Sequence, residues 1–288
     1  MNKMRDALDR FRPRRRWGQN FLINQGAADA IVAAFRPRPD DLVIEIGPGR
    51  GVLTHRLAGR VSRLAAIEID PDLAVPLRED MRVSPSVEIV QADILELDLT
   101  ALLGRLGATT ARRARVIANL PYSIATTVIL RLIDERRLLA DLLVMVQREV
   151  AERIASPHGR KSYGGLSVLC QAQARVERLL RLRPGSFRPI PKVGSELVRL
   201  TLHDTGAATS VIGAPVPFTL EALLRTAFAQ RRKTLLNNLA RLHGPGGDPM
   251  GPAAAADLLR GAGLDPRARP EEIPVGGFLA LLRALRAL

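Results

Sequence analysis

Between about Ala27 and Asp204, short apolar runs rich in β-branched residues alternate with segments of helical pattern. This alternation is typical of a mainly parallel sheet that is covered by helices. The sequence therefore predicts an α/β fold with a Rossmann-like, doubly wound sheet and helices on both faces. The predicted strands are Leu42–Ile46, Leu64–Ile69, Val87–Gln91, Arg115–Ala118, Leu142–Gln147, Val176–Leu182 and Glu196–Leu202.

The helix that follows the second predicted strand has a clear start signal. Asp70 is a good capping residue, and a proline such as Pro71 suits the first helical position. We expect Leu73–Met81 to be helical, and we expect Pro76 to kink or shorten this helix.

The composition changes after Asp204. Thr205–Pro217 is rich in Gly, Ala, Pro, Ser and Thr, which is typical of a linker. The predicted domains are a basic arm over residues 1–16, a main domain over 17–207 and a helical domain over 208–288. The helices expected in the last domain are Thr219–Gln230, Arg232–Leu242, Ala253–Gly261 and Val275–Ala287.

The chain is strongly basic, with 43 Lys and Arg against 29 Asp and Glu, a net charge of +14. Nearly all the basic residues are arginine, whose planar fork can bond two phosphate oxygens at once. A polyanionic partner is one reading, and codon bias with the excess spread over solvated faces is the other. The N-terminal arm is either an RNA-phosphate contact or a soluble tail, and its basic residues are Lys3, Arg5, Arg10, Arg12, Arg14, Arg15 and Arg16.

Several classes of protein are excluded by what the sequence lacks. Cys170 is the only cysteine, so an internal disulfide and a thiolate zinc cluster are ruled out. The four histidines show no metal-ligand spacing, and we expect no metal. The apolar runs Leu142–Val146 and Gly276–Leu288 are too short or are interrupted by arginine, so no membrane-spanning segment is expected. No apolar stretch follows the basic arm, which excludes a secretory signal.

A glycine-rich turn, Glu45–Gly51, follows the first predicted strand and opens a helix. Gly47, Gly49 and Gly51 allow positive φ angles and let the backbone approach a ligand closely. Their GxGxG spacing differs from the GxGxxG of dinucleotide enzymes, which favours S-adenosylmethionine over NAD. A close-packed turn without a ligand is the alternative.

Two acids follow the next strands of the sheet. Glu68 closes the second strand, where an acid can accept both hydroxyls of a ribose. Asp93 follows the third strand, within reach of an adenine amino group. Asp70 competes with Glu68 for the ribose, and each acid could instead cap a helix or lie in a solvated loop.

The tetrad Asn119–Tyr122 lies at the carboxyl end of the fourth strand, the edge where open α/β sheets bind ligands. The amide oxygen of Asn119 and the carbonyl oxygen of Leu120 can accept the two hydrogens of an adenine amine. Pro121 stiffens the turn, and Tyr122 offers a ring for an extruded base. The alternative is a proline turn with a core tyrosine.

Phe187 lies in the proline-rich segment Pro184–Lys192. Because prolines fix the loop, this ring could be the second half of a stacking clamp. Taken alone, such a phenylalanine is more often a hydrophobic residue that covers a surface.

Seven motifs occur together in one order: Gly18–Leu22, Glu45–Gly51, Glu68–Asp70, Asp93, Asn119–Thr126, Gln147–Val150 and Phe187–Lys192. From about Trp17 to near the C-terminus, the chain thus resembles the rRNA adenine N(6),N(6)-dimethyltransferases. The resemblance implies a class I S-adenosylmethionine-dependent methyltransferase sheet with a small all-α C-terminal domain. It implies base handling by Asn119, Leu120, Pro121, Tyr122 and Phe187, and cofactor contacts by Asn20, Leu22, Gly47, Glu68, Asp93 and Asn119.

Two C-terminal segments, Ala227–Thr234 with Asn237 and Gly263–Glu271, resemble the KsgA-type small-subunit branch more than the erythromycin-resistance branch. That branch implies a substrate of two adjacent adenosines in the 3′-terminal hairpin loop of 16S rRNA in an assembling small subunit. It also implies a C-terminal domain that contacts the ribosome, a monomer and a cytoplasmic location. Two positions depart from the family pattern, because Gly194 and Asn24 stand where relatives often carry Asp.

Two other functions remain open at this point. A family member can bind nucleic acid without methylating it, as transcription or assembly factors do; loss of the cofactor glycines or of Asn119 would favour that reading, and both are present. A large-subunit methyltransferase is the second. An NAD-dependent oxidoreductase is weakened by the glycine spacing, and Tyr122 and Tyr163 lack a lysine four residues later.

Overall fold

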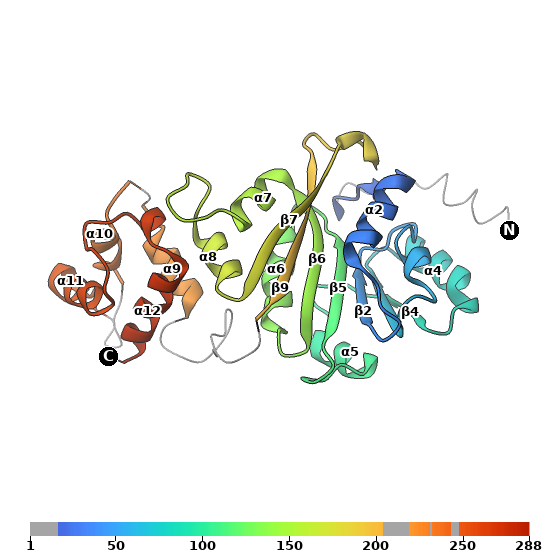
Figure 1. Cartoon of the computed structure of the whole chain (residues 1–288), viewed down its shortest axis with the longest axis horizontal. Helices are drawn as coiled ribbons and strands as arrows, with labels where there is room; N and C mark the ends of the chain where they lie inside the picture. The colour runs from blue at the N-terminus through green and yellow to red at the C-terminus, as the bar shows by residue number, and fades with distance from the viewer. Residues whose placement is uncertain (1–16, 204–218, 231, 243–247, 288) are drawn as a thin grey trace. The chain divides into compact units, whose positions relative to one another are not determined.

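The computed structural model describes residues 17–203, 219–230, 232–242 and 248–287 (Figure 1). The predicted basic arm, the predicted linker and the boundary at residue 207 lie outside these described residues. The chain divides into two compact units, one formed by Met1–Ala151 with Glu177–Asp204 and the other by Glu152–Val176 with Thr205–Leu288.

The first unit is built on a seven-stranded sheet of order β4-β3-β2-β5-β6-β9-β7. Neighbours from β4 to β6 are parallel, whereas β9 runs antiparallel to β6. All seven predicted strands are confirmed, and their ends differ from the prediction by at most three residues. The strands are β2 Leu42–Ile46, β3 Arg63–Glu68, β4 Val87–Gln91, β5 Ala114–Asn119, β6 Leu139–Gln147, β7 Ala174–Leu182 and β9 Ser195–Leu202.

Both faces of the central strands of this sheet are buried, whereas the edge strands β4 and β7 are partly exposed. Val43, Ile117 and Leu143 point to one face, where they join a core cluster with Ile31 and Phe35 of helix α2. Strand neighbours point to opposite faces, and the alternate residues are equally buried, as Ile44, Val116 and Leu142 show. Helices therefore cover both sides, as predicted, and this explains why the strands read as continuous apolar runs.

Helices of the first unit fill the connections between strands. Their bounds are α2 Gln25–Phe35, α3 Thr54–Leu57, α4 Pro71–Asp80, η2 Met81–Val83, α5 Leu99–Leu106, α6 Ala125–Asp134 and η3 Pro184–Ser186, while α7 Arg148–Ile154 crosses the boundary between the units.

Helix α2 begins at one of the two departures from the family pattern. The side chain of Asn24 accepts a hydrogen bond from the backbone N–H of Ala27 at 2.8 Å and so caps the helix. Asn and Asp cap helices about equally well. The replacement of Asp by Asn24 therefore keeps the local structure.

Helix α4 starts as the sequence predicts, with Asp70 as N-cap and Pro71 at the first position. The predicted shortening by Pro76 is wrong, because α4 continues past it to Asp80. Pro76 has no N–H to donate to the carbonyl four residues earlier, that of Asp72, and Asp72 is exposed in the first turn.

The amino-terminal edge of the parallel strands is closed by ion pairs. Arg115 of β5 contacts Asp41 and Asp141, the latter at 3.0 Å, and its guanidinium lies over the ring of Phe35. Arg199 of β9 contacts Asp141 from the other side. The opposite, carboxyl edge carries the functional residues.

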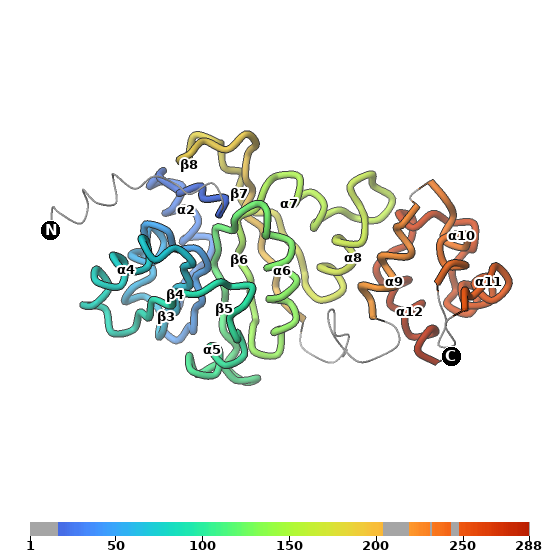
Figure 2. Tube along the Cα trace, turned by 180° about the vertical axis from the view of Figure 1, so that it is seen from behind, coloured from blue at the N-terminus to red at the C-terminus, as the bar shows by residue number. Residues whose placement is uncertain are grey.

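A second, two-stranded sheet was not predicted. β1, Phe21–Leu22, pairs antiparallel with β8, Phe187–Arg188, so that Leu22 lies opposite Phe187. Figure 2 shows β8 next to α2, at the end of the main sheet opposite α5.

The second unit is helical, as predicted for the C-terminal region. Residues 152–176 belong to it, which the sequence did not indicate. The hydroxyl of Tyr163 donates to the carbonyl oxygen of Ile273 at 2.9 Å, and the Tyr163 ring meets Phe228 edge-on. The helices of this unit are α8 Gly165–Gln171, α9 Leu220–Ala227, α10 Leu235–Leu239, α11 Gly251–Gly261, η4 Pro270–Glu272 and α12 Val275–Arg286.

Candidate active site

A cavity opens at the carboxyl ends of β2, β3, β4 and β5. This is the edge where open α/β sheets bind ligands. Its lining residues are Trp17, Gly18, Gln19, Asn20, Phe21, Ile46, Gly47, Gly49, Ile67, Glu68, Ile69, Leu73, Ala92, Asp93, Ile94, Asn119, Leu120, Pro121 and Ile124.

The glycine turn forms the floor of this cavity. Gly47 and Gly49 have φ angles of +69° and +57°, which only glycine adopts readily. A Cβ on Gly49 would lie 3.0 Å from the Phe21 ring. Gly51 is not a lining residue: a Cβ there would lie 2.5 Å from Leu77 Cδ1, so the structure requires glycine at this position for helix packing.

Glu68 lies at the end of β3 with only 5% of its surface exposed. Its two oxygens accept hydrogen bonds from the backbone N–H groups of Gly49 and Asp70, each at 3.0 Å. Burial raises the pKa of Glu68, and these two hydrogen bonds oppose the rise. A carboxylate has about four lone-pair sites, so Glu68 can still accept from a ligand.

Asp70 competed with Glu68 for the ribose, and the structure separates the two acids. Asp70 does not line the cavity; its carboxylate caps α4 through the N–H of Asp72 and accepts from the side chain of Gln19. Glu68 is therefore the acid placed to meet a ligand.

Asp93 lines the cavity beyond β4. Its Oδ1 accepts from the backbone N–H of Leu95 at 2.8 Å, which fixes the carboxylate. Apolar side chains form the adjoining walls, among them Ile67, Leu73 and Ile94. An acceptor beside an apolar slot suits a nucleobase with an amino group.

The segment Trp17–Phe21 forms one wall. Within it, the side chain of Asn20 donates to the carbonyl oxygen of Gly18 at 3.0 Å. Leu22 follows in β1 and lines a small adjoining hollow together with Glu45, Arg50 and Asn119. Both predicted cofactor residues of this segment are thus close to the glycine turn.

Asn119 ends β5 and lines both hollows. Its side-chain N–H donates to the carbonyl oxygen of Asn20 at 3.0 Å, which turns the amide oxygen, Oδ1, the other way. Neither Oδ1 of Asn119 nor the carbonyl oxygen of Leu120 accepts a hydrogen bond from any described residue. Two acceptors at the tip of β5 therefore remain for a ligand.

Pro121 lines the cavity, but two predicted base-handling residues do not. The hydroxyl of Tyr122 pairs with that of Ser195 at 2.7 Å, and partial burial raises its pKa. Phe187 is 1% exposed and packs in the core cluster with Leu22. The stacking roles of Tyr122 and Phe187 stay predictions.

Gly194, the second departure, lies before β9, where its carbonyl oxygen accepts from the N–H of Arg148 at 3.0 Å. A Cβ at this position would lie 3.4 Å from the carbonyl oxygen of Leu182. This is about van der Waals distance, so the position does not require glycine, and the backbone contact to Arg148 is independent of the side chain.

Sequence reasoning missed several residues of the site. Trp17 adjoins the Gly18–Leu22 motif, and Gln19 and Phe21 belong to it. Their place in or beside this motif is the sequence signal that could have assigned them to the cavity. Glu45 was noted only as the start of the glycine turn. It is 2% exposed, accepts from the Thr54 hydroxyl at 2.7 Å, and burial raises its pKa to about 7.

These residues fit S-adenosylmethionine. Gly47 and Gly49 line the cavity with positive φ angles and no side chain, so the backbone of the turn can approach a ligand closely. Glu68 and Asp93 offer acceptors to a ribose and an adenine, and the walls between them are apolar. In the described residues, no three His, Cys, Asp or Glu side chains are grouped to hold a metal ion. No described helix is long and apolar enough to cross a membrane.

Comparison with known proteins gives consistent results. The family model "Ribosomal RNA adenine dimethylase" matches residues 10–249. The chain is 41% identical over 269 residues to ribosomal RNA small subunit methyltransferase A of Acidobacterium capsulatum, covering 93% of this chain and 89% of that one. It is also 41% identical over 278 residues to the protein of the same name from Geobacter metallireducens, covering 96% and 97%.

Solved structures show the same fold. A dimethyladenosine transferase from Plasmodium falciparum superposes with a TM-score of 0.75 at 24% identity, covering 91% of this chain and 96% of that one. The 23S rRNA methyltransferase ErmE gives a TM-score of 0.64 at 25% identity, with 92% and 99% covered.

Proposed function

Because the chain belongs to the ribosomal RNA adenine dimethylase family, we propose that it dimethylates two adjacent adenosines in the 3′-terminal hairpin loop of 16S rRNA. The substrate is an assembling small ribosomal subunit or its precursor, and the methyl donor is S-adenosylmethionine. The protein acts as a cytoplasmic monomer.

The observation that carries the proposal is the pair of open acceptors at the end of β5. An adenine amine is a weak nucleophile because its lone pair is conjugated into the ring. When Asn119 Oδ1 and the Leu120 carbonyl accept its two hydrogens, they favour a pyramidal nitrogen with an available lone pair. Pro121 keeps this turn rigid and adds no competing donor.

The cofactor would bind in the cavity that Asn119 lines. Gly47, Gly49, Glu68, Asp93 and the 17–22 segment would hold S-adenosylmethionine, which supplies an electrophilic methyl group when bound. The amine becomes strongly acidic only after it has taken the methyl group, so its proton can leave to water. No base with a shifted pKa is needed.

The small-subunit reading is favoured over the large-subunit one by similarity. Identity to two small-subunit enzymes is 41%, against 25% to the 23S enzyme ErmE. The non-enzymatic alternative is disfavoured because the cavity, its glycine floor and the Asn119 acceptor are all present.

The experiment is mass spectrometry of the 3′ end of small-subunit rRNA from cells with and without this gene. We expect the two dimethyladenosines to disappear in the deletion and to return with the wild-type gene. Unchanged modification would contradict the proposed substrate. Calorimetry with S-adenosylmethionine is the second arm, and absence of binding would revive the non-enzymatic reading.

A further inference from the structure

Gln19 joins the wall of the cavity to the body of the sheet. Its side-chain N–H donates to Oδ2 of Asp70 at 3.0 Å, across 51 positions of the sequence. Asp70 is fully buried, with 0% exposure, and its other oxygen caps α4. A hydrogen bond to a buried carboxylate is stronger than one between neutral groups, so this contact is a firm attachment.

A second attachment holds the same segment one residue later. The carbonyl oxygen of Asn20 accepts from the side-chain N–H of Asn119. Gly18, on the other side of Gln19, lies close enough to Pro121 that a Cβ would be 3.5 Å from the proline ring. Gly18 and Asn20 therefore lie at the end of β5, and the side chain of Gln19 between them reaches Asp70 beyond the end of β3.

The Asp70 attachment continues into the cofactor site. The backbone N–H of Asp70 donates to Glu68, whose second oxygen accepts from the N–H of Gly49. A chain of hydrogen bonds thus runs from Gln19 through Asp70 and Glu68 to the glycine floor. Residues 18–20 are thus connected at one point to Glu68, the acid proposed to bind the cofactor. At the other point they are connected to Asn119, the amide proposed to bind the adenine.

We propose that Gln19 is a positioning residue: through Asp70 it fixes the 17–21 wall over the cofactor cavity, and thereby fixes the Asn20 carbonyl that orients the Asn119 amide. The inference rests on the proposed function and adds a role for a side chain that needs no contact with the reacting atoms. Loss of this bond loosens the wall, lowers cofactor affinity and leaves the Asn119 amide free to rotate.

The first test is Gln19→Met, which keeps the shape of the side chain and removes the donor. Gln91→Met is the matched control, because Gln91 is exposed at the end of β4 and does not line the cavity. Loss of one hydrogen bond to a charged group should raise the Kd for S-adenosylhomocysteine about tenfold. Amide hydrogen exchange should quicken in residues 17–22 of the ligand-free protein more than elsewhere, and the Tm should fall because the buried Asp70 carboxylate loses a donor. The control should match the wild type in all three.

Asp70→Ser tests the route through Asp70. Serine is a good N-cap, so α4 keeps its cap, but its side chain is too short to reach Gln19 as well. We expect the same loss of affinity as in Gln19→Met, and no further loss in the double variant, because both changes remove one contact.

Three results would overturn the inference. Unchanged affinity and exchange in Gln19→Met would show that the bond has no such role. A loss in Gln19→Met without one in Asp70→Ser, or losses that multiply in the double variant, would show that Gln19 contacts the cofactor directly. Absence of S-adenosylhomocysteine binding by the wild type would instead refute the proposed function, whatever the variants do.

Discussion

Asn119 uses the two halves of its amide differently: the nitrogen is tied to Asn20, and the oxygen is left for a ligand. At the scale of single residues, we propose from this division that Asn119 acts in the reaction more than in RNA binding. Asn119→Ala should lower the rate of methyl transfer by about a hundredfold, the usual effect of losing one polar group that supports a transition state.

RNA affinity of Asn119→Ala should change little, because other contacts hold the subunit. Single-turnover methylation and filter binding on undermethylated small subunits measure the two quantities separately. Equal losses in rate and affinity would identify Asn119 as a binding residue only.

Glu45 gives a prediction about stability and pH. Burial raises its pKa from 4.5 to about 7 in the folded protein, so between these values the unfolded chain releases a proton that the folded one keeps. The free energy of unfolding should therefore fall as the pH rises through this window, by up to about 3 kcal/mol.

Glu45→Gln removes this titration and keeps an acceptor for the Thr54 hydroxyl. Urea unfolding at pH 4.5 and pH 8 should show a smaller loss of stability in the variant than in the wild type. The same pH dependence in both proteins would exclude Glu45 as its source.

At the scale of elements, the main strands could be predicted because each is a buried run of apolar residues. The turns after β2, β3 and β5 could be predicted because glycine, acids and proline mark them. The two-residue strands β1 and β8 could not, since a pair that short has no periodicity. Because this pairing was not predicted, the burial of Phe187 against Leu22 was not predicted either. The different positions of Gly51, packed against Leu77, and Gly47, at the cavity, depend on contacts between distant segments, which the motif alone does not show.

The assignment of residues 152–176 to the helical unit was also beyond the sequence, because it depends on contacts with residues a hundred positions away. Tyr163 supplies such a contact through its hydroxyl. Tyr163→Phe leaves the carbonyl of Ile273 without its buried donor, and the free energy of unfolding should fall by about 1–3 kcal/mol.

Denaturant unfolding measures this loss. Tyr122→Phe is the matched control, since the hydroxyl of Tyr122 is only half-buried and pairs with another hydroxyl; its cost should be smaller. An equal fall in the free energy of unfolding in the two variants would mean that the hydrogen bond of Tyr163 stabilises the protein no more than that of Tyr122.

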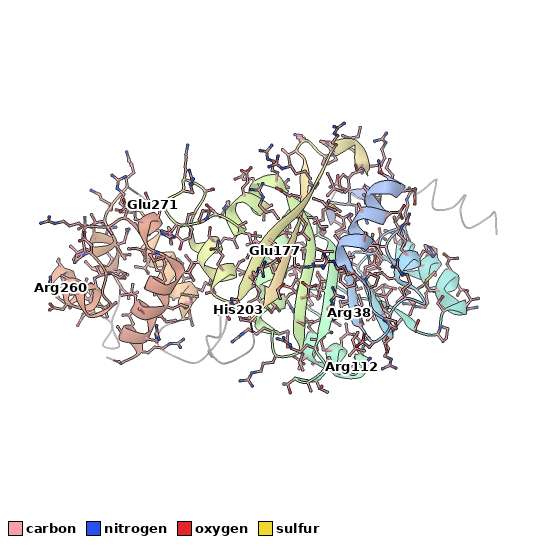
Figure 3. The ribbon with its side chains drawn as sticks, viewed as in Figure 1. Arg38, Arg112, Glu177, His203, Arg260 and Glu271 are labelled. Atoms are coloured by element: carbon pink, nitrogen blue, oxygen red, sulfur yellow. The ribbon has the colours of Figure 1, made fainter. Side chains whose placement is uncertain are left out.

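At the scale of the whole molecule, the net charge of +14 is the main feature. Arg38 and Arg112 of the first unit and Arg260 of the second, labelled in Figure 3, are exposed. Cations that meet phosphates release counterions, so affinity for small subunits should fall steeply with salt, by about a thousandfold or more between 50 and 200 mM if six or more phosphates are contacted.

Cofactor affinity, measured in the same buffers, should depend little on salt and is the internal control. Deletion of residues 1–13 should reduce the salt slope for RNA and leave cofactor affinity unchanged. A flat salt response of the full chain would mean that its charge is incidental to binding.

The ladder between β1 and β8 has a consequence for how the two substrates are handled. Phe21 lines the cofactor cavity and lies opposite Arg188, at the start of the proline-rich loop that leads to β9. Because the strands are paired, a ligand that immobilises one of them also immobilises the other. The second ligand then binds to a strand that is already ordered, and its binding costs less conformational entropy. RNA and cofactor should therefore bind cooperatively, and by thermodynamic reciprocity each should tighten the other by the same factor.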